Sequence, residues 1–305
     1  MSFKVSVIIP IFNAAAFLEE AVQSALQQQE VAELILVEDG SSDASFQLAE
    51  QLEKSDPRIQ LFQHPDRQNH GAGASRNLGI RKANSPFLAF LDADDFYLKN
   101  RFKNCPDFFA RHPNALGLYE AVGSQFQTPD AEKFFLDNIR GKGLTSLEEP
   151  VAPDQLFEVL LRGQKGWWHL NGFTIRKKLI EQIGFFDEQL RMAQDSDFNL
   201  RSSLSRQIYP GSLTVPVALR RVHSNNRILN REKAIHYKRL FYAKWFKKML
   251  KAKWSVPSNR FLLSTHLSYH PWVNRQKQNW SRRLVKIILA PIYLIRYPLL
   301  FRKLF

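Results

Sequence analysis

The segment that decides the fold is Phe87-Leu88-Ala89-Phe90-Leu91-Asp92-Ala93-Asp94-Asp95. Its apolar run, Phe87–Leu91, predicts a strand that is buried on both faces. A buried strand cannot carry free carboxylates, because removing an unpaired charge from water is very costly. We therefore expect the three aspartates just past the carboxyl end of this strand, where open α/β sheets bind their ligands.

Two of these carboxylates, Asp92 and Asp94, are two residues apart in the sequence. In an extended chain that spacing points both side chains to the same side. Two carboxylate oxygens on one side suit Mg²⁺ or Mn²⁺, with a substrate diphosphate completing the coordination shell. The alternative is a polar loop in which Asp95 caps the amino terminus of a helix.

Earlier segments alternate between strand-like and helix-like patterns. Apolar runs at 5–9, 33–37 and 59–62 predict strands, and apolar residues at helical spacing between the strands predict helices. Pro10 has no N–H to donate, so we expect it to stop the first strand. Together with the strand at 87–91, this β-α-β-α-β-α-β order predicts an α/β fold with a Rossmann-like, doubly wound and mostly parallel sheet.

Polar residues follow the second and third predicted strands. Asp39 can accept a hydrogen bond from a base N–H, such as the imide of uracil, or its segment can be a loop that caps a helix. Arg76, after the glycine-rich turn Gly71–Gly73, can neutralise a phosphate or lie on a solvated helix face. The turn lacks the third glycine of a dinucleotide-binding fingerprint.

Two later segments offer a base and a metal ligand. Asp195 can act as general base on a hydroxyl nucleophile, and on a helix Asp197 would point elsewhere. Alternatively, both acids only favour the start of a helix. His223 becomes interesting as a third metal ligand beside Asp94, whereas a lone histidine is usually structural or on the surface.

The composition predicts two parts with different roles. The 305 residues suffice for one large α/β domain with an appendage, and the single Cys105 excludes an internal disulfide and fits a reducing compartment. Residues 227–305 carry 19 Lys or Arg and one acid, a net charge of +18, whereas residues 1–226 carry −4. We expect a domain at 1–226 and a basic, aromatic-rich, helical tail at 227–305.

Seven ordered segments between residues 4 and 226 resemble family 2 glycosyltransferases. The resemblance implies a GT-A fold, a nucleotide-sugar donor, a divalent metal and inversion at the anomeric carbon. The matching segments are Val5–Gln27, Glu38–Asp43, Gly71–Gly79, Asp92–Asp95, Asn171–Glu188, Gln194–Arg201 and Arg220–Asn226.

The resemblance also implies roles for individual residues. The family often has Asp where this chain has Glu38, and Glu where it has Gln194. Because Gln194 is uncharged, we expect the pKa of the neighbouring candidate base, Asp195, to be lower than it would be beside a glutamate. A like charge nearby raises a carboxyl pKa. By position, the resemblance implies that Pro10, Phe12 and Asp39 contact the nucleoside and that Arg76 lies near the donor. It implies that Asp92 contacts the ribose or the sugar, that Asp94 binds the metal and that His223 lies near the metal and the diphosphate. It assigns the role of catalytic base to Asp195.

Two other classes of protein compete with this interpretation. A sugar nucleotidyltransferase has a similar α/β beginning but needs a glycine-rich phosphate loop after the first strand, where this chain has Pro10-Ile11-Phe12-Asn13. A nucleic-acid-binding protein could use the tail, because basic and aromatic residues bind single strands. No nucleic-acid-binding module is recognisable in the sequence, so we expect no nucleic-acid partner.

The tail is predicted to lie on an anionic membrane surface. The alternatives are a helical lid that packs on the catalytic body with its basic face solvated, and a tilted span with snorkelling charges. Lysines and aromatic residues are interleaved at 241–254, which suits the headgroup region. Within 284–301, Lys286 and Arg296 bound a charge-free run shorter than the roughly 20 residues that a span needs. We therefore expect a cytoplasmic protein, peripheral on the inner face of the cell membrane. From Asp39 we expect a UDP-sugar donor, and the resemblance implies a glycan or lipid-linked acceptor in cell-surface glycan synthesis.

Overall fold

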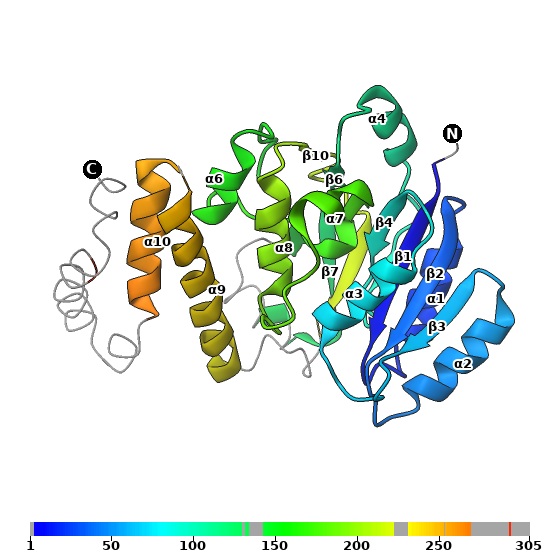
Figure 1. Cartoon of the computed structure of the whole chain (residues 1–305). Helices are drawn as coiled ribbons and strands as arrows, with labels where there is room; N and C mark the ends of the chain where they lie inside the picture. Colours follow the sequence, from blue (N-terminus) through cyan, green and yellow to red (C-terminus); the bar gives the residue numbers. More distant parts are fainter. Residues whose placement is uncertain are drawn as a thin grey trace. The chain divides into compact units, whose positions relative to one another are not determined.

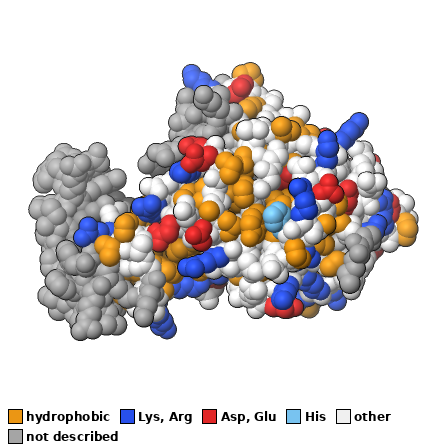
Figure 2. Space-filling view, turned by 90° about the horizontal axis from the view of Figure 1, so that it is seen from above, with side chains coloured by type: hydrophobic (Ala, Val, Ile, Leu, Met, Phe, Trp, Pro, Cys, Tyr) orange, Lys and Arg blue, Asp and Glu red, His pale blue; other side chains and the backbone are white. Residues whose placement is uncertain are grey.

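The computed structural model describes residues 3–129, 132–133, 143–222, 231–252, 254–269 and 293. The chain forms two compact units, Met1–Asn226 and Arg227–Phe305. On the face of the larger unit seen in Figure 2, acidic and basic side chains are interspersed. This mixture accords with the small net charge of the larger unit.

The first part of the larger unit alternates strands and helices in the predicted order. β1 pairs in parallel with β2 and with β4, and β2 pairs in parallel with β3. The sheet therefore contains the order β3-β2-β1-β4 (Figure 1). The elements are β1 (Val5–Ile11), α1 (Leu18–Leu26), β2 (Val31–Glu38), α2 (Ser45–Ser55), β3 (Ile59–Gln63), α3 (Ala72–Lys82) and β4 (Phe87–Phe90).

Three more strands complete a seven-stranded sheet. β9 (Phe173–Arg176) pairs antiparallel with both β4 and β6 (Gly117–Tyr119), and β10 (Ile208–Pro210) extends the edge parallel to β6. The full order is β10-β6-β9-β4-β1-β2-β3. The predicted α/β fold with a mostly parallel sheet is confirmed, and β9 is its antiparallel member.

Helices pack on both faces of this sheet, because its central strands are apolar on both sides. Val7 and Ile9 of β1 belong to one buried cluster with α1, α2 and α4 (Cys105–Arg111). Ile8, which points the other way, belongs to a second cluster with α3, α6 (Leu156–Leu161), α7 (Lys178–Ile183) and α8 (Gln194–Ser203). The sheet is therefore doubly wound, and its strand ends are held by packing on both sides.

The strands of a second, smaller sheet alternate along the chain with the later strands of the larger sheet. Its strands are β5 (Phe96–Tyr97), β7 (Val122–Phe126), β8 (Leu144–Thr145) and β11 (Ala218–Val222), in the order β5-β11-β7-β8. β11 pairs antiparallel with β5, with Leu219 opposite Phe96. Because β5 begins directly after Asp95, this pairing brings β11 to the carboxylate turn.

Pro10 lies inside β1, so the prediction that it stops the strand is wrong. It pairs with Val37 of β2. On the side of β4, the ladder reaches only to Ile8, whose carbonyl oxygen accepts a hydrogen bond from the N–H of Leu91 at 3.1 Å. In a strand, the backbone N–H and C=O groups of residues two apart point to the same neighbouring strand. Pro10, like Ile8, therefore faces β4, and the N–H that it lacks would have pointed to that side. The hydrogen bonds between β1 and β2 are unaffected.

Among its described residues, the smaller unit contains the helices α9 (Arg231–Lys251) and α10 (Val256–Ser268). They pack through stacked rings, with 4.6 Å between the ring centroids of Phe246 and His266 and 5.3 Å between those of Tyr242 and Tyr269. The predicted helical tail is confirmed for these residues. Within the described ranges, no helix is both long enough and apolar enough to cross a bilayer. Except for Tyr293, the segment 284–301 lies outside the described residues.

Candidate functional site

The carboxylates of the deciding segment lie just past the end of β4, as predicted. β4 ends at Phe90, and the N–H of Asp95 donates to the carbonyl oxygen of Asp92 at 3.0 Å. Residues 92–95 therefore form a turn, and the extended geometry assumed for Asp92 and Asp94 is wrong. The turn joins β4 to β5, which belongs to the other sheet.

Asp95 fixes this turn to the rest of the site. Its carboxylate is 1% exposed and accepts hydrogen bonds from the Asn171 side-chain amide at 2.6 Å and from the N–H of Arg221 at 2.8 Å. Burial raises the pKa of the Asp95 carboxyl well above its usual value, and the charges of Asp94 and Asp92 act in the same direction. No helix follows Asp95, because β5 begins at the next residue, so its alternative role as a helix cap is wrong.

Asp92 pairs with an arginine from α3. Arg76 is 4% exposed, donates a hydrogen bond to the Asp92 carboxylate and lies 5.6 Å from the ring centroid of Phe186. The interpretation of Arg76 as part of a solvated helix face is therefore wrong. The pair places one cation and one anion at the carboxyl edge of the sheet.

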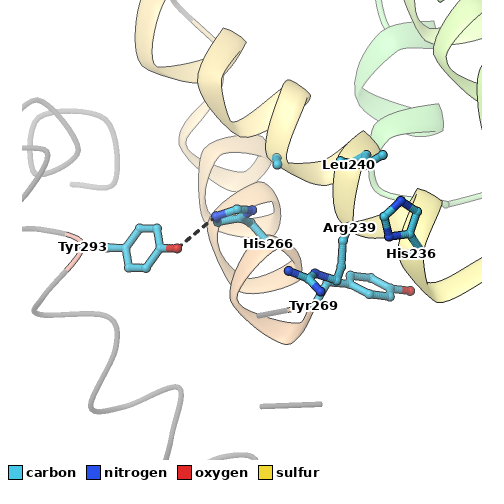
Figure 3. Close-up of a pocket in the computed structure, with 7 residues that line it drawn as sticks. His236, Arg239, Leu240, His266, Tyr269 and Tyr293 are labelled. Carbon is cyan, nitrogen blue, oxygen red and sulfur yellow. Dashed lines mark hydrogen bonds between the residues drawn. The ribbon is translucent and has the colours of Figure 1, made fainter. Parts of the chain in front are cut away.

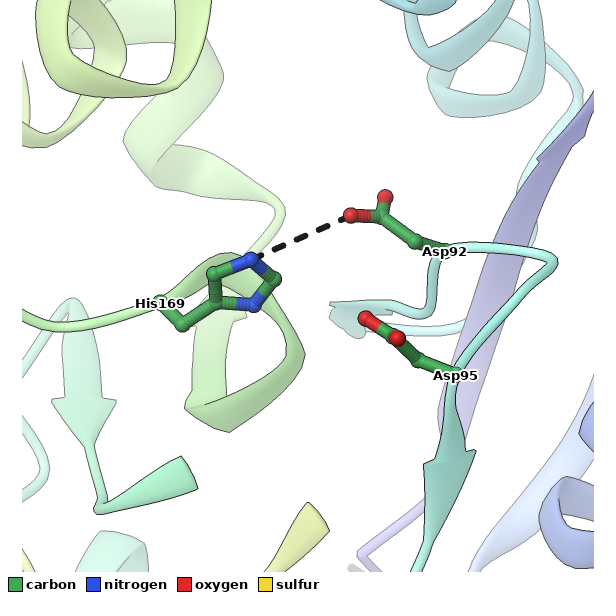
Figure 4. Close-up of side chains that lie close together, drawn as sticks. All are labelled: Asp92, Asp95 and His169. Atoms are coloured by element: carbon green, nitrogen blue, oxygen red, sulfur yellow. Dashed lines mark ion pairs between the residues drawn. The ribbon is translucent and has the colours of Figure 1, made fainter. Parts of the chain in front are cut away.

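His169 faces the other oxygen of the same carboxylate. Its Nε2 lies 3.9 Å from an oxygen of Asp92 (Figure 4). Its Nδ1 accepts a hydrogen bond from the N–H of Asn171 at 3.3 Å, which in the neutral ring leaves the proton on Nε2. Burial lowers the pKa of the His169 imidazole, although the nearby charge of Asp92 opposes this.

Asn171 positions both sides of this contact. It is fully buried in the short 3₁₀ helix η1 (Leu170–Gly172), and its side-chain oxygen accepts a hydrogen bond from the N–H of Asp92 at 3.2 Å. Sequence reasoning missed both His169 and Asn171. The signal that could have found them is two polar residues within the largely apolar stretch Trp167–Phe173.

The side chains at this edge fit a divalent cation. Ligand atoms of Asp92, Asp95 and His169 all lie within 4.8 Å of one another. Carboxylate oxygens and an imidazole nitrogen are ligands that Mn²⁺ accepts, and carboxylates alone suit Mg²⁺. Asp95 already accepts two hydrogen bonds, which limits its capacity to bind a metal ion. The half-buried Asp94 beside it offers a further carboxylate as a metal ligand. His223, the other predicted ligand, lies outside the described residues.

Asp39 is also buried, and its carboxylate holds the loop before α3. It is 2% exposed and accepts hydrogen bonds from the Asn69 side chain and the Gly71 N–H, both at 2.9 Å, and from the His70 N–H at 2.8 Å. Gly40 makes this close approach possible, because a Cβ there would lie 2.8 Å from the backbone nitrogen of Asn69. Asp39 thus joins the end of β2 to the glycine-rich turn.

The predicted nucleoside residues gather at one sheet edge. Pro10 is buried in β1, Phe12 follows that strand directly, and the N–H of Asp39 donates to the carbonyl oxygen of Ile11 at 2.8 Å. The loops after β1 and β2 are also joined, because the Asn13 side chain accepts from the N–H of Ser42 at 2.8 Å. Pro10, Phe12 and Asp39 therefore lie together, and their contact with a nucleoside stays a prediction.

Asp195 is the second residue of α8, and its side chain has a different environment from that of Asp197. The Asp195 carboxylate is half-buried and accepts a hydrogen bond from the N–H of Ser196 at 2.8 Å. Asp197 is fully buried and pairs with Arg201 at 2.7 Å. The predicted divergence of the two aspartates is confirmed, and Asp197 has a structural role.

The electrostatic environment of Arg220 places Asp195 near the turn. Burial lowers the pKa of the Arg220 guanidinium, and the charges of Asp95, Asp92, Asp94 and Asp195 all oppose that shift. The charge of Asp195 also raises the pKa of His169. Asp195 and the turn therefore act electrostatically on the same two groups, although about a hundred residues separate them in the sequence. Sequence reasoning had assigned no role to Arg220.

The fold is that of GT-A glycosyltransferases. Staphylococcus aureus TarS, residues 1–349, in complex with UDP-GlcNAc, aligns with a TM-score of 0.63 and 20% identity over 90% of this chain and 76% of that chain. A mannosyltransferase from Pyrobaculum calidifontis, in complex with GDP-Man and Mn²⁺, aligns with a TM-score of 0.57 and 14% identity over 98% of this chain and 85% of that chain. These similarities establish the architecture.

The chain belongs to glycosyl transferase family 2, whose sequence model matches residues 6–161. The uncharacterized glycosyltransferase EpsJ of Bacillus subtilis is 31% identical over 64% of this chain and 55% of its own length. The minor teichoic acid biosynthesis protein GgaB of the same organism is 32% identical over 64% of this chain and 20% of its own length. The chain thus spans about half the length, or less, of these curated relatives.

Proposed function

We propose that this protein transfers a sugar from a UDP-sugar to an acceptor hydroxyl, with inversion at the anomeric carbon, in the synthesis of a cell-surface glycan. Family membership supports sugar transfer from a nucleotide donor. The similarity to a teichoic acid biosynthesis protein supports a surface glycan. The structure of TarS with UDP-GlcNAc supports a uridine nucleotide as donor.

One observation carries this proposal: the charges of Asp195 and of the Asp92–Asp95 turn shift the pKa values of the same two side chains. Their charges converge on His169 and Arg220. A transferase of this kind needs a donor-binding group and a base on opposite sides of one reacting carbon. This shared influence supports a site at the carboxyl edge of the sheet, where α/β folds bind ligands, that uses both groups.

Asp195 is the proposed general base. Its carboxylate takes the proton of the acceptor hydroxyl while that oxygen forms a bond to the anomeric carbon. The bond between this carbon and the diphosphate oxygen breaks on the opposite face, and the nucleoside diphosphate leaves with the electron pair. The half-buried position of this carboxylate in the first turn of α8 leaves part of it accessible to an acceptor hydroxyl.

Mg²⁺ or Mn²⁺ is the proposed cofactor, with Asp94 and His223 as ligands. A bound divalent cation supplies positive charge where negative charge develops on the diphosphate. Asp92 is proposed to contact the ribose or the sugar. Arg76 then remains close to the donor, where its guanidinium can bind a phosphate oxygen in place of Asp92.

Pro10, Phe12 and Asp39 are the proposed nucleoside contacts. A carboxylate has about four lone-pair positions, and Asp39 uses three of them to accept from Asn69, His70 and Gly71. The imide N–H of uracil would use the remaining position on Oδ1, beside His64, whose Nε2 lies 3.5 Å from the same oxygen. In this proposal the loop before α3 helps form the pocket for the base, because Asp39 holds it there.

We also propose that residues 1–226 form the catalytic domain and residues 227–305 a membrane-binding tail. The charge of +18 in the tail supports attraction to anionic lipids. The protein would then be cytoplasmic and peripheral on the inner face of the cell membrane. This position would bring the site near a glycan or lipid-linked acceptor.

The test of this function is a panel of nucleotide sugars incubated with the full chain and Mn²⁺. We expect release of UDP from at least one UDP-sugar, and tighter calorimetric binding of UDP than of GDP. Tighter binding of GDP would contradict the uridine assignment. Pyrophosphate release from a nucleoside triphosphate and a sugar phosphate, without UDP release, would instead indicate a sugar nucleotidyltransferase.

A further inference from the structure

The smaller unit contains a cavity of about 390 Å³, lined by side chains of α9, of α10 with the following Tyr269, and of Tyr293 (Figure 3). On α9, His236 and Arg239 contribute polar groups and Leu240 contributes an apolar surface that is 41% exposed. His236 and Arg239 are three residues apart, so they lie on the same face of the helix. This side of the cavity therefore combines a fixed positive charge with an apolar wall.

The side of the cavity formed by α10 is held by aromatic stacking. His266 stacks on Phe246 with an angle of 9° between the rings, and its Nε2 lies 3.2 Å from the hydroxyl of Tyr293. Tyr269 stacks on Tyr242 with an angle of 14°. Stacked rings have few alternative rotamers, so their polar atoms are already oriented before a ligand arrives.

Each polar side chain around this cavity can donate a hydrogen bond. None of the described side chains that line it is acidic. Arginine with hydroxyl and imidazole donors binds phosphate oxygens well, because a guanidinium offers paired N–H groups to an anion. A free carboxylate ligand would use the same donors, but the apolar wall favours an anion attached to a hydrophobic group.

We propose that this cavity binds the phosphate of a phosphate ester that is carried on an apolar group. Arg239 pairs with the phosphate, Tyr269 donates a further hydrogen bond, and Leu240 contacts the apolar part. Such a site differs from general attraction to a charged membrane, because it depends on particular donors and not on the total charge of the tail.

The experiment is calorimetric titration of the full chain with short-chain phosphatidic acid and, separately, with inorganic phosphate. We expect saturable binding of phosphatidic acid, and weaker binding of inorganic phosphate, which lacks the apolar part. Arg239→Gln should weaken the binding of phosphatidic acid by about tenfold or more, as for loss of a charge-assisted hydrogen bond. Tyr269→Phe, which keeps the stacked ring, should weaken it severalfold.

Lys247→Gln is the matched control, because Lys247 is exposed on α9 and does not line the cavity. It should change the affinity by about twofold or less. Equal losses for Arg239→Gln and Lys247→Gln, or the absence of saturable binding, would overturn the proposal in favour of diffuse attraction. Equal affinity for inorganic phosphate would overturn the role of the apolar wall.

Circular dichroism checks that each variant keeps its helices, and Tyr269→Phe decides the question if Arg239→Gln does not fold. UDP release, measured on the same samples, depends on the larger unit. Loss of lipid binding with normal UDP release would therefore contradict this inference alone, whereas normal lipid binding without UDP release would contradict only the proposed transferase activity.

Discussion

Asn171 makes three hydrogen bonds that join the separate parts of the candidate site. Its side chain accepts from the N–H of Asp92 and donates to Asp95, and its backbone N–H donates to His169. The position needs an acceptor and a donor on one short side chain. An aspartate would lose the donor and place a second carboxyl group against Asp95, and an apolar residue would lose both bonds.

Replacing Asn171 with alanine should destabilise the protein, because Asp95 and the N–H of Asp92 would lose their buried partner. We expect the free energy of unfolding to fall by about 1–3 kcal/mol, measured by urea denaturation. Asn114→Ala is the control, since Asn114 is exposed. Equal stability of the two variants would mean that the bonds of Asn171 contribute nothing to the fold.

Asp94→Ala tests the proposed metal ligand. We expect Mn²⁺-dependent release of UDP to be lost while the melting temperature stays close to that of the wild type, since the side chain of Asp94 is only half-buried. Asp107→Ala removes an exposed carboxylate from α4 and should leave turnover unchanged. Unchanged turnover in Asp94→Ala would place the metal elsewhere.

The sequence predicted the site residues at strand ends but not those contributed by distant elements. Asp39 and Asp92 follow apolar runs directly, so a local pattern marks them. Asn171 and Arg221 reach Asp95 across 76 and 126 residues, through the pairing of β9 with β4 and of β11 with β5. No local pattern encodes that pairing. The polar residues within the apolar stretch 167–173 could mark His169 and Asn171 as candidates, but only the fold shows that they share a site with Arg220.

Helix α3 packs unusually close to strand β1. A Cβ at Gly79 of α3 would lie 2.5 Å from Cγ2 of Ile8, which is fully buried in β1. Glycine allows the helix to lie this near to the strand. The same helix presents Arg76, one turn earlier, to Asp92, so the packing of α3 also sets the position of a site residue.

Gly79→Ala should therefore destabilise the protein, although alanine is the better helix former by about 1 kcal/mol. Overpacking of a filled core costs about 1–3 kcal/mol, and here the clash involves a branch near the backbone of Ile8. A double-mutant cycle with Ile8→Ala provides the check, because removing Cγ2 should cost less free energy of unfolding in the Gly79→Ala background. Additive effects would show that the two side chains do not compete for space.

Considered as a whole molecule, the chain concentrates its positive charge in one part. Residues 227–305 carry +18 and residues 1–226 carry −4. Composition alone predicted this division, because charge can be counted without a fold. Composition did not predict the cavity between α9 and α10, because its lining depends on which faces of the two helices meet.

The charge of the tail predicts how the full chain binds vesicles. It should float with vesicles that contain phosphatidylglycerol, less so at high salt, and not with vesicles of phosphatidylcholine alone, because salt screens attraction to an anionic surface. Equal flotation with both kinds of vesicle, independent of salt, would indicate an apolar anchor instead of a charged contact.

Asp195→Asn tests most directly whether the two groups of carboxylates form one active site. The measurement is the rate of UDP release from the UDP-sugar that the wild type uses, with donor binding followed by calorimetry on the same preparation. We expect donor affinity close to that of the wild type and a turnover that is lower by on the order of a hundredfold, the effect of losing a general base. Turnover near the wild-type rate, with the donor bound normally, would contradict the assignment of Asp195 as the base.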